Sequence, residues 1–283
     1  MTLRSKEVGG VALLDGSPSS LFSSLVRNKY LLSLFIRREL TGRYRGSLLG
    51  ILWPFMHPFL MLIVYTFAFG MMMKPRGHEL ASSPLEFGIA IFSGLMVFNF
   101  FAECLQRAPT LLQSHSNLVK KVVFPLEILP VAAAGSAFIH ALVSFLIWAL
   151  FYTLIRGALP PGSAFLFPIV LMSVGLFTLG VSWVLSGVAV FLKDVQQVVG
   201  PLLSILLFVS PIFYPGASFP EKARWVLHLN PIRPAVEMAH QVLMEGKAPE
   251  ALDFFGYLGF SLITCWLGYA IFQRARRGFA DVL

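Results

Sequence analysis

Charged side chains are scarce in this chain, making up only 13% of its 283 residues, whereas hydrophobic residues make up 57%. A typical soluble domain carries about 25% charged residues. With so few charges, a chain of this length would leave large apolar surfaces exposed to water. The scarcity of charge therefore excludes an ordinary soluble protein and indicates a chain embedded in a membrane.

Motifs that bind nucleotides or metals are also missing. There is no phosphate-binding loop of the form G-x-x-x-x-G-K-[ST], and no His-x-x-x-His or Cys-x-x-Cys pair. Cys104 and Cys265 lie near or inside apolar stretches, so we expect small buried side chains and no disulfide framework. We expect no metal, no cofactor and no enzymatic activity on this chain.

Six uncharged, apolar stretches account for most of the sequence. A helix of about 20 apolar residues crosses the roughly 30 Å core of a bilayer, and five of the stretches reach that length. The shortest stretch reaches it only if Glu103 lies at the lipid headgroups. The sequence thus predicts an all-α polytopic membrane protein with six transmembrane helices, in one domain over residues 1–283. The stretches are Gly46–Met73, Phe87–Ala102, Ile128–Ile155, Gly157–Leu192, Val195–Pro220 and Phe254–Gln273.

Basic residues are distributed unevenly between the two sides of such a bundle. Six spans place both termini on one side, and 15 of the 22 Lys and Arg residues then lie in segments on that side. Because Lys and Arg concentrate in cytoplasmic loops, we expect both termini in the cytoplasm. The net charge of +8 therefore reflects orientation in the membrane and not binding to nucleic acid.

Two amphipathic segments are expected on the cytoplasmic side. Residues 19–40 have apolar residues at helical spacing with basic residues between them, which is typical of an interfacial helix on the membrane surface; the alternative is a solvated helix. Residues 107–124 are too polar to cross the membrane and too amphipathic for a plain loop, which indicates a docking element for a cytoplasmic partner. Residues 1–18 are expected to be a flexible extension, and the first 20 residues lack the apolar core of a signal peptide.

The segment that leads into the first span contains regularly spaced glycines. Gly42, Gly46 and Gly50 are four residues apart, so a continuous helix would place them on one face and allow close contact with another helix. Pro54 and Pro58 are expected to kink the entry to this span.

The loop between spans five and six has the pattern of two short helices. Ser218-x-x-Glu221 is a capping box that predicts a helix over 219–229, and Asn230–Pro231 ends it. A second helix is expected from Pro234 to Met244, with Gly246 as its C-cap. We expect both helices to be shallowly inserted on the outer side, within residues 214–251.

Two features inside the spans leave alternatives open. His57 and His140 are isolated histidines with no acidic partner apparent in the spans, so a structural role is favoured over a proton relay. The many aromatic residues of the first three spans either face lipid or line a conduit in which they stack on sugar rings. Because the spans have essentially no buried charge, any transport must take its energy from another subunit.

Five motifs in order give the chain a family resemblance. R-R-E-L-x-x-R-Y-R-x-S-x-L-G-x-x-W-x-x-x-x-P (Arg37–Pro58) resembles the N-terminal signature of permeases of type-2 ABC exporters. N-L-V-K-K-V-x-F-P-L-E-I-L-P (Asn117–Pro130) resembles the coupling segment of the polysaccharide branch. K-D-V-Q-Q-V (Lys193–Val198), S-P-I-F-Y-P (Ser210–Pro215) and L-N-P (Leu229–Pro231) are similar to later signatures of that branch. The resemblance spans about residues 20–280.

The resemblance implies a homodimer in the inner membrane, with two copies of a separate ABC ATPase subunit that bind ATP and Mg. Its substrate would be a lipid-linked polysaccharide such as an O-antigen, moved out of the cytoplasm through a conduit between the two copies. Membrane lipid would surround the dimer. The residues implied for ATPase coupling are Leu112, Ser116, Asn117, Leu118, Lys120 and Lys121. The family-motif residues are Arg43, Tyr44, Arg45, Gly50, Trp53, Pro58 and Asp194. The channel would be lined by Trp53, Phe59, Tyr65 and Phe98. The outer gate would contain Pro211, Tyr214, Pro215, Trp225, Asn230 and Pro231.

Three other functions compete with this interpretation. A permease of the same superfamily would export a small lipid, a drug or haem, but the polysaccharide-type signatures argue against it. A membrane-embedded acyl- or glycosyltransferase would need clustered acids or histidines, whereas Glu103, Glu127 and Asp194 are dispersed in the sequence. A purely structural membrane scaffold would not need the segment 107–124.

Overall fold

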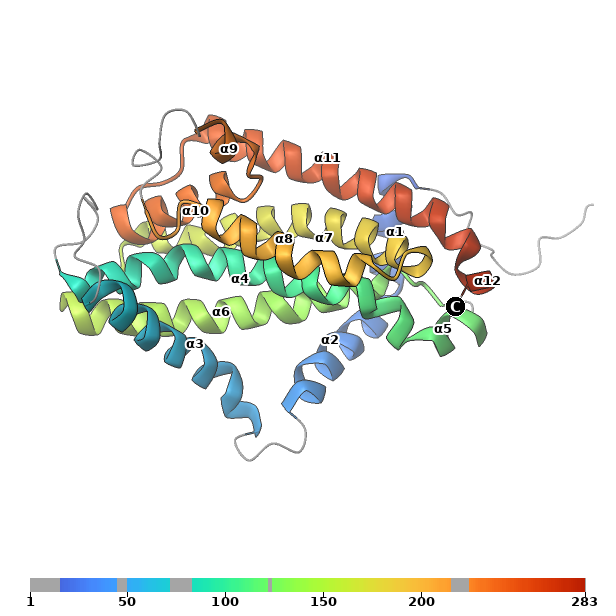
Figure 1. The fold of residues 1–283 in the computed structure, drawn as a ribbon, viewed down its shortest axis with the longest axis horizontal. Helices are drawn as coiled ribbons and strands as arrows, with labels where there is room; N and C mark the ends of the chain where they lie inside the picture. The colour runs from blue at the N-terminus through green and yellow to red at the C-terminus, as the bar shows by residue number, and fades with distance from the viewer. Residues whose placement is uncertain (1–15, 45–49, 72–82, 122–123, 215–223, 283) are drawn as a thin grey trace, which may run out of the picture.

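The computed structural model describes residues 16–44, 50–71, 83–121, 124–214 and 224–282, and all elements across these residues are helices (Figure 1). The α-helices are α1 (Pro18–Arg27), α2 (Lys29–Tyr44), α3 (Trp53–Tyr65), α4 (Pro84–Ser114), α5 (Ser116–Lys121), α6 (Ile128–Arg156), α7 (Phe167–Phe191), α8 (Val195–Val209), α9 (Arg224–Leu229), α10 (Arg233–His240), α11 (Ala251–Ala275) and α12 (Phe279–Val282). The 3-10 helices are η1 (Gly50–Leu52), η3 (Gly162–Leu166) and η7 (Arg276–Gly278), and the π-helical segments are η2 (Thr66–Met71) and η6 (Gln241–Glu245).

Each predicted apolar stretch contains one α-helix among its described residues, and two of the stretches also contain short 3-10 or π-helical segments. Four helical segments, Pro84–Ser114, Ile128–Arg156, Gly162–Phe191 and Ala251–Gly278, are long and apolar enough to cross a membrane. The other two stretches form the shorter apolar helices Trp53–Ala68 and Val195–Val209. The all-helical fold and the multi-pass membrane character are thus confirmed.

The shortest predicted span forms the longest helix. α4 has 31 residues and continues through Glu103 and Arg107 to Ser114, so Glu103 lies well inside the helix and not at its end. Sequence hydropathy ended the stretch at Ala102 because polar residues follow. Those residues keep a helical spacing, and a helix persists where only one of its faces becomes polar.

α4 is the central helix of the bundle. It packs against α3, α6, α7, α8 and α10, and its residues from Phe87 to Phe98 are all buried. Trp148 of α6 is fully buried, and its indole Nε1 donates a hydrogen bond to the carbonyl oxygen of Ile89, 3.3 Å away. Buried indole nitrogens usually find such a partner. This bond fixes the last third of α6 against the first turns of α4.

α7 and α11 form the most extensive helix pair in the bundle. At Gly180 of α7 an added Cβ would lie 2.3 Å from the carbonyl oxygen of Thr264 in α11. Glycine therefore permits a direct contact between the two backbones, as small residues commonly do between membrane helices. Cys104 and Cys265 are both buried and no disulfide joins them.

The elements predicted to be cytoplasmic gather at one end of the bundle. α1, α5 and α12 lie at the right of Figure 1, whereas α10 and the start of α11 lie toward the left. The predicted helix 19–40 is two helices, because Asn28 ends α1: its side-chain Nδ2 donates to the carbonyl oxygen of Ser24 at 2.8 Å. α2 then packs on α6.

The predicted glycine stripe is wrong. Gly42 lies in α2, which ends at Tyr44, whereas Gly50 begins η1 with a φ of +47°, a conformation that favours glycine. The two glycines thus do not share a helix face, and Gly46 lies outside the described residues. Pro54 occupies the first turn of α3, where proline is tolerated, and Pro58 lies inside α3.

The outer segment contains the two expected short helices, with different bounds. α9 covers the end of the predicted helix 219–229, and Ser218 and Glu221 lie outside the described residues. α10 continues as η6, and Gly246 caps it with a φ of +72°, as its position after Met244 predicted. Ala235, Val236 and Ala239 of α10 are fully buried and the helix packs on α4; the shallow insertion of the two helices in the membrane stays a prediction.

Candidate functional site

A polar stripe runs along one face of α4. Asn99, Glu103, Gln106 and Arg107 follow at intervals of four, three and one residues, so they lie on the same side of the helix. Asn99 and Gln106 are exposed, whereas the apolar residues before them are buried. A polar face on an otherwise apolar helix of this length favours a water-filled or substrate-filled space beside it.

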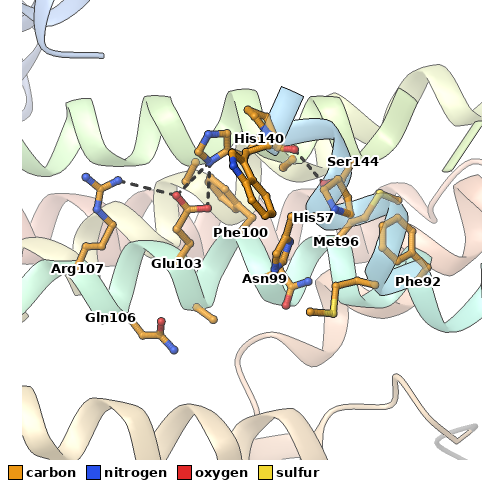
Figure 2. A pocket seen from close by; sticks show the side chains of 17 residues that line it. His57, Phe92, Met96, Asn99, Phe100, Glu103, Gln106, Arg107, His140 and Ser144 are labelled. Carbon is orange, nitrogen blue, oxygen red and sulfur yellow. Dashed lines mark hydrogen bonds and ion pairs between the residues drawn. The ribbon is translucent and has the colours of Figure 1, made fainter. Parts of the chain in front are cut away.

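This stripe forms the floor of a cavity of about 510 Å³ between α3, α4 and α6 (Figure 2). The cavity combines apolar and aromatic side chains with several hydrogen-bonding groups, as small-molecule sites typically do. α3 contributes Trp53, Pro54, His57, Pro58 and Met61; α4 contributes Phe92, Met96, Asn99, Phe100, Ala102, Glu103, Gln106 and Arg107; α6 contributes Ala137, His140, Ala141 and Ser144.

A network of ionisable side chains lies at one end of this cavity and extends from it to α2. The Nδ1 of His140 lies 3.2 Å from Glu103 Oε1, and the Nη1 of Arg107 lies 3.9 Å from the same oxygen. The other guanidinium nitrogen of Arg107 forms an ion pair with Glu39 of α2. The four side chains are 14% to 24% exposed, so water screens them only in part. The network therefore joins α2, α4 and α6.

The prediction that the intramembrane histidines have no acidic partner is wrong. Glu103 is that partner for His140, and His57 lines the same cavity (Figure 2). Sequence analysis missed the pair because it ended the second span one residue before Glu103. The spacing of Asn99, Glu103 and Gln106 was the available signal, since it places three polar groups on one helix face.

The predicted channel aromatics have different surroundings. Trp53 lines the cavity and is 38% exposed. Phe59 packs edge-on against Phe151, with 5.5 Å between ring centroids, and Tyr65 is half-buried at the end of α3. Phe98 is buried beside Phe101 and does not line the cavity. Trp53 is thus the predicted aromatic that the fold brings to the polar stripe.

The other family-motif residues lie at element boundaries. Arg43 and Tyr44 belong to the last turn of α2, and Gly50 begins η1. Asp194 is exposed at the N-cap position of α8, where its side chain makes no capping hydrogen bond. Arg45 lies outside the described residues.

The predicted coupling segment is divided between two helices. Leu112 lies in α4 and is fully buried, so it supports the segment from inside and presents no surface to a partner. Ser116, Asn117, Leu118, Lys120 and Lys121 form α5, in which Asn117 and Lys120 are exposed and Leu118 is half-buried. α5 contacts α12, so the segment lies against the carboxyl-terminal end of the chain.

The predicted outer-gate residues meet at a buried polar contact. Asn230 is 3% exposed, and its Nδ2 donates to the Oγ of fully buried Ser210 at 2.8 Å; its Oδ1 accepts from the Ile232 amide at 3.0 Å. The neighbours Pro211 and Pro231 pack here, buried and half-buried respectively. Asn230 thus ties the end of α8 to the start of α10.

The two aromatic residues of the gate differ in exposure. Tyr214 is half-buried, and its hydroxyl donates to the carbonyl oxygen of Phe208. Trp225 of α9 is 62% exposed. Pro215 lies outside the described residues.

Comparison with known proteins found a protein family whose model matches most of the chain. The family described as ABC-2 type transporter matches residues 30–244. That range contains α2 to α10, the cavity and the Ser210–Asn230 contact.

Individual relatives match over nearly their whole length. The chain is 29% identical over 266 residues to the O-antigen export system permease protein RfbA of Myxococcus xanthus, which covers 91% of this chain and 98% of the relative. It is 25% identical over 256 residues to an RfbA of Klebsiella pneumoniae, covering 89% and 95% of the two chains. The polysialic acid transport protein KpsM of Escherichia coli is 24% identical over 243 residues, covering 85% and 91%.

Proposed function

Because the chain belongs to the ABC-2 type transporter family, we propose that it is the membrane subunit of an ATP-driven exporter of lipid-linked polysaccharide. The substrate would move from the cytoplasm across the inner membrane. One observation carries the proposal: the chain covers 91% to 98% of the length of relatives named for O-antigen export or polysialic acid transport. The chain itself performs no catalysis and holds no cofactor.

The proposed topology has six spans in a single permease domain over residues 1–283, with both termini in the cytoplasm. The four long helical segments would cross the bilayer fully, and α3 and α8 would supply the two shorter spans. The gathering of α1, α5 and α12 at one end of the bundle supports a common cytoplasmic side. Of the extension expected over residues 1–18, residues 1–15 lie outside the described residues, whereas Pro18 begins α1 and the Trp266 indole donates to the Gly16 carbonyl oxygen at 3.0 Å.

Energy would come from two copies of an ABC ATPase subunit, which bind ATP and Mg, beneath a homodimer of this chain. α5 is the proposed contact, because its exposed Asn117 and Lys120 and its half-buried Leu118 present a small mixed surface. The absence of a phosphate-binding loop in the sequence is consistent with nucleotide chemistry on another subunit.

The cavity beside α4 is the proposed contact with the glycan. A sugar ring has hydroxyl groups around its edge and C–H groups on its faces, so it suits a site with both polar and aromatic walls. Asn99 and Gln106 would hydrogen-bond hydroxyl groups, and Trp53 would stack on a ring face. The segment 214–251, with α9 and α10, would form the gate on the outer side.

The alternative is export of a small lipid, a drug or haem by the same kind of subunit. Deleting the gene separates the two functions, because a polysaccharide exporter leaves lipid-linked glycan inside the cell and none at the surface. Normal surface glycan in the deletion strain would contradict the proposal. The chain should also be recovered from detergent-solubilised membranes with an ATPase subunit in a one-to-one ratio.

The role of α5 requires a more local test. Leu118→Asp should abolish recovery of the ATPase subunit and export of glycan, while the purified chain keeps its thermal stability. Leu192→Asp is the matched control, since it places the same charge on an exposed leucine of the turn between α7 and α8. Equal recovery of the ATPase with both variants would rule out docking at α5.

A further inference from the structure

Glu127 is a buried carboxylate at the exit of the coupling segment. It occupies the N-cap position of α6, a few residues after α5, and its side chain is only 6% exposed. Ionised carboxylates are almost never buried to this extent unless they are paired, because burial removes their hydration. Its surroundings therefore carry information about what this position does.

Three elements supply hydrogen bonds to Glu127. The Ser24 hydroxyl of α1 donates to Oε1 at 2.6 Å, and the Arg276 guanidinium of η7 donates to Oε2 at 3.0 Å. The indole Nε1 of Trp183 in α7 donates to the main-chain oxygen of Glu127 at 3.1 Å. Residues up to 149 positions from Glu127 in the sequence thus meet at this one residue.

Arg276 also donates a hydrogen bond to the main chain just before α6. Its other guanidinium nitrogen, Nη2, donates to the carbonyl oxygen of Phe124 at 2.7 Å. A guanidinium presents several donors in a fixed fork, so one side chain bonds to both the carboxylate and the main chain. Arg276 therefore holds the segment before α6 at two points, Phe124 and Glu127.

Aromatic packing surrounds this polar contact. The ring of Phe124 lies 5.5 Å from that of Phe35 in α2, and Phe35 lies 6.1 Å from the ring of His115, between α4 and α5. Phe279 of α12 is fully buried against Phe272, and α12 touches α5. α5 thus lies beside α12, and Phe35 of α2 packs against His115 and Phe124 on either side of α5 in the sequence.

We propose that Glu127 is a positioning residue that ties the start of α6, which follows α5 in the chain, to α1 and to η7 just after α11, so that ATP-driven movement of α5 is transmitted to those elements as well as to α4 and α6. This inference rests on the proposed function in assigning α5 to the ATPase contact. A buried ion pair adds little net stability compared with apolar packing, so stability alone does not account for this arrangement. The contacts of Glu127 instead define one geometry between the start of α6 and the elements α1, α7 and η7.

The first test uses the isolated chain in detergent and needs neither partner nor glycan. Glu127→Gln keeps the shape of the side chain and an acceptor for Ser24 but removes the charge that Arg276 binds. Hydrogen exchange of residues 116–127 should be faster in Glu127→Gln and in Arg276→Met than in the unchanged chain. Arg277→Met is the matched control, because Arg277 is exposed one residue away. Unchanged exchange in both variants would overturn the proposal.

The second test uses the full complex in proteoliposomes and measures glycan exported per ATP hydrolysed. Glu127→Gln and Arg276→Met should bind the ATPase subunit and hydrolyse ATP, while export per ATP falls roughly two- to thirtyfold. Arg276→Lys, which keeps a cation for Glu127, should restore part of the ratio. A parallel loss of assembly and export at an unchanged ratio would make Glu127 merely structural and would overturn the proposal.

The two tests separate this proposal from the proposed function. If the unchanged complex exports no polysaccharide, the proposed function fails, and the exchange experiment still decides whether Glu127 and Arg276 hold α5. If the unchanged complex exports normally and the variants match it in both measurements, only the positioning role fails.

Discussion

Gly268 of α11 packs directly on the backbone of Gly180 in α7: a Cβ atom at Gly268 would lie 2.1 Å from the Gly180 carbonyl oxygen. The obstructing atom belongs to a helix backbone and cannot rotate away. The two helices must therefore separate before any larger residue fits at this position.

We expect Gly268→Ala to destabilise the chain by about 1–3 kcal/mol, the usual effect of overpacking a close contact. Thermal unfolding of the purified chain in detergent would measure the change. Gly259→Ala is the control on the same helix, because nothing lies within 4 Å of a Cβ there. Equal midpoints for the two variants would show that α7 and α11 are not in backbone contact.

Arg107 is expected to stabilise the junction of α2, α4 and α6. Arg107→Met leaves the carboxylates of Glu39 and Glu103 without their cation in a partly buried site, which should cost about 1–2 kcal/mol of unfolding free energy. Lys247→Met, which breaks the pair with Glu245 at a lysine that is 74% exposed, should cost about 0.5 kcal/mol or less. Chemical denaturation of the variants would compare them, and an equal loss would contradict a structural role for the network.

Glycan contact in the cavity predicts a loss of export rate without a loss of stability. Trp53→Ala and Asn99→Leu should each slow export, and losing a contact of about 1 kcal/mol corresponds to roughly a fivefold change in rate. Phe55→Ala is the control, because Phe55 is also an exposed aromatic of α3 but does not line the cavity. Export assays on all three, with thermal midpoints alongside, would test the assignment. Normal export by Trp53→Ala and Asn99→Leu would remove the cavity from the path.

Asn230 is expected to be hard to replace despite its place in a loop. Asn230→Ala leaves the buried Ile232 amide without its acceptor and removes one hydrogen bond of the Ser210 hydroxyl, which keeps its bond to the carbonyl oxygen of Leu206; the expected cost is about 1–3 kcal/mol. Leu229→Ala, which removes a side chain that is 71% exposed, should change stability far less. Thermal unfolding of the two variants gives the comparison, and a larger effect at Leu229 would contradict the buried contact.

Hydropathy predicted the helices well but not their ends. The start of α6 at Ile128 and the identity of all six apolar helices follow from apolar runs, since a membrane helix must keep apolar residues outward. The boundary after Phe87–Ala102 failed because hydropathy treats Glu103 as an end, whereas Glu103 pairs with Arg107 of the same helix and with His140 of α6. Such tertiary pairing is not encoded in a local window.

Capping residues could be predicted where the backbone conformation alone determines where the helix ends. Gly246 ends η6 in a left-handed conformation that glycine adopts readily. The break at Asn28, in contrast, depends on a side-chain hydrogen bond within a segment whose helical pattern continues. Buried Leu112 shows the same limit, because its burial depends on elements that are distant in the sequence.

The length of α8 has a consequence for how it would cross the bilayer. Its 15 residues rise about 22 Å, which is less than the roughly 30 Å of hydrocarbon in a typical membrane. As the proposed fifth span, α8 would therefore end at the depth of the acyl tails, where irregular backbone persists only if protein or water surrounds it. Ser210, Pro211 and Ile212 are buried in protein there. The proposed fifth span would thus be completed by a turn shielded inside the protein and not by further helix.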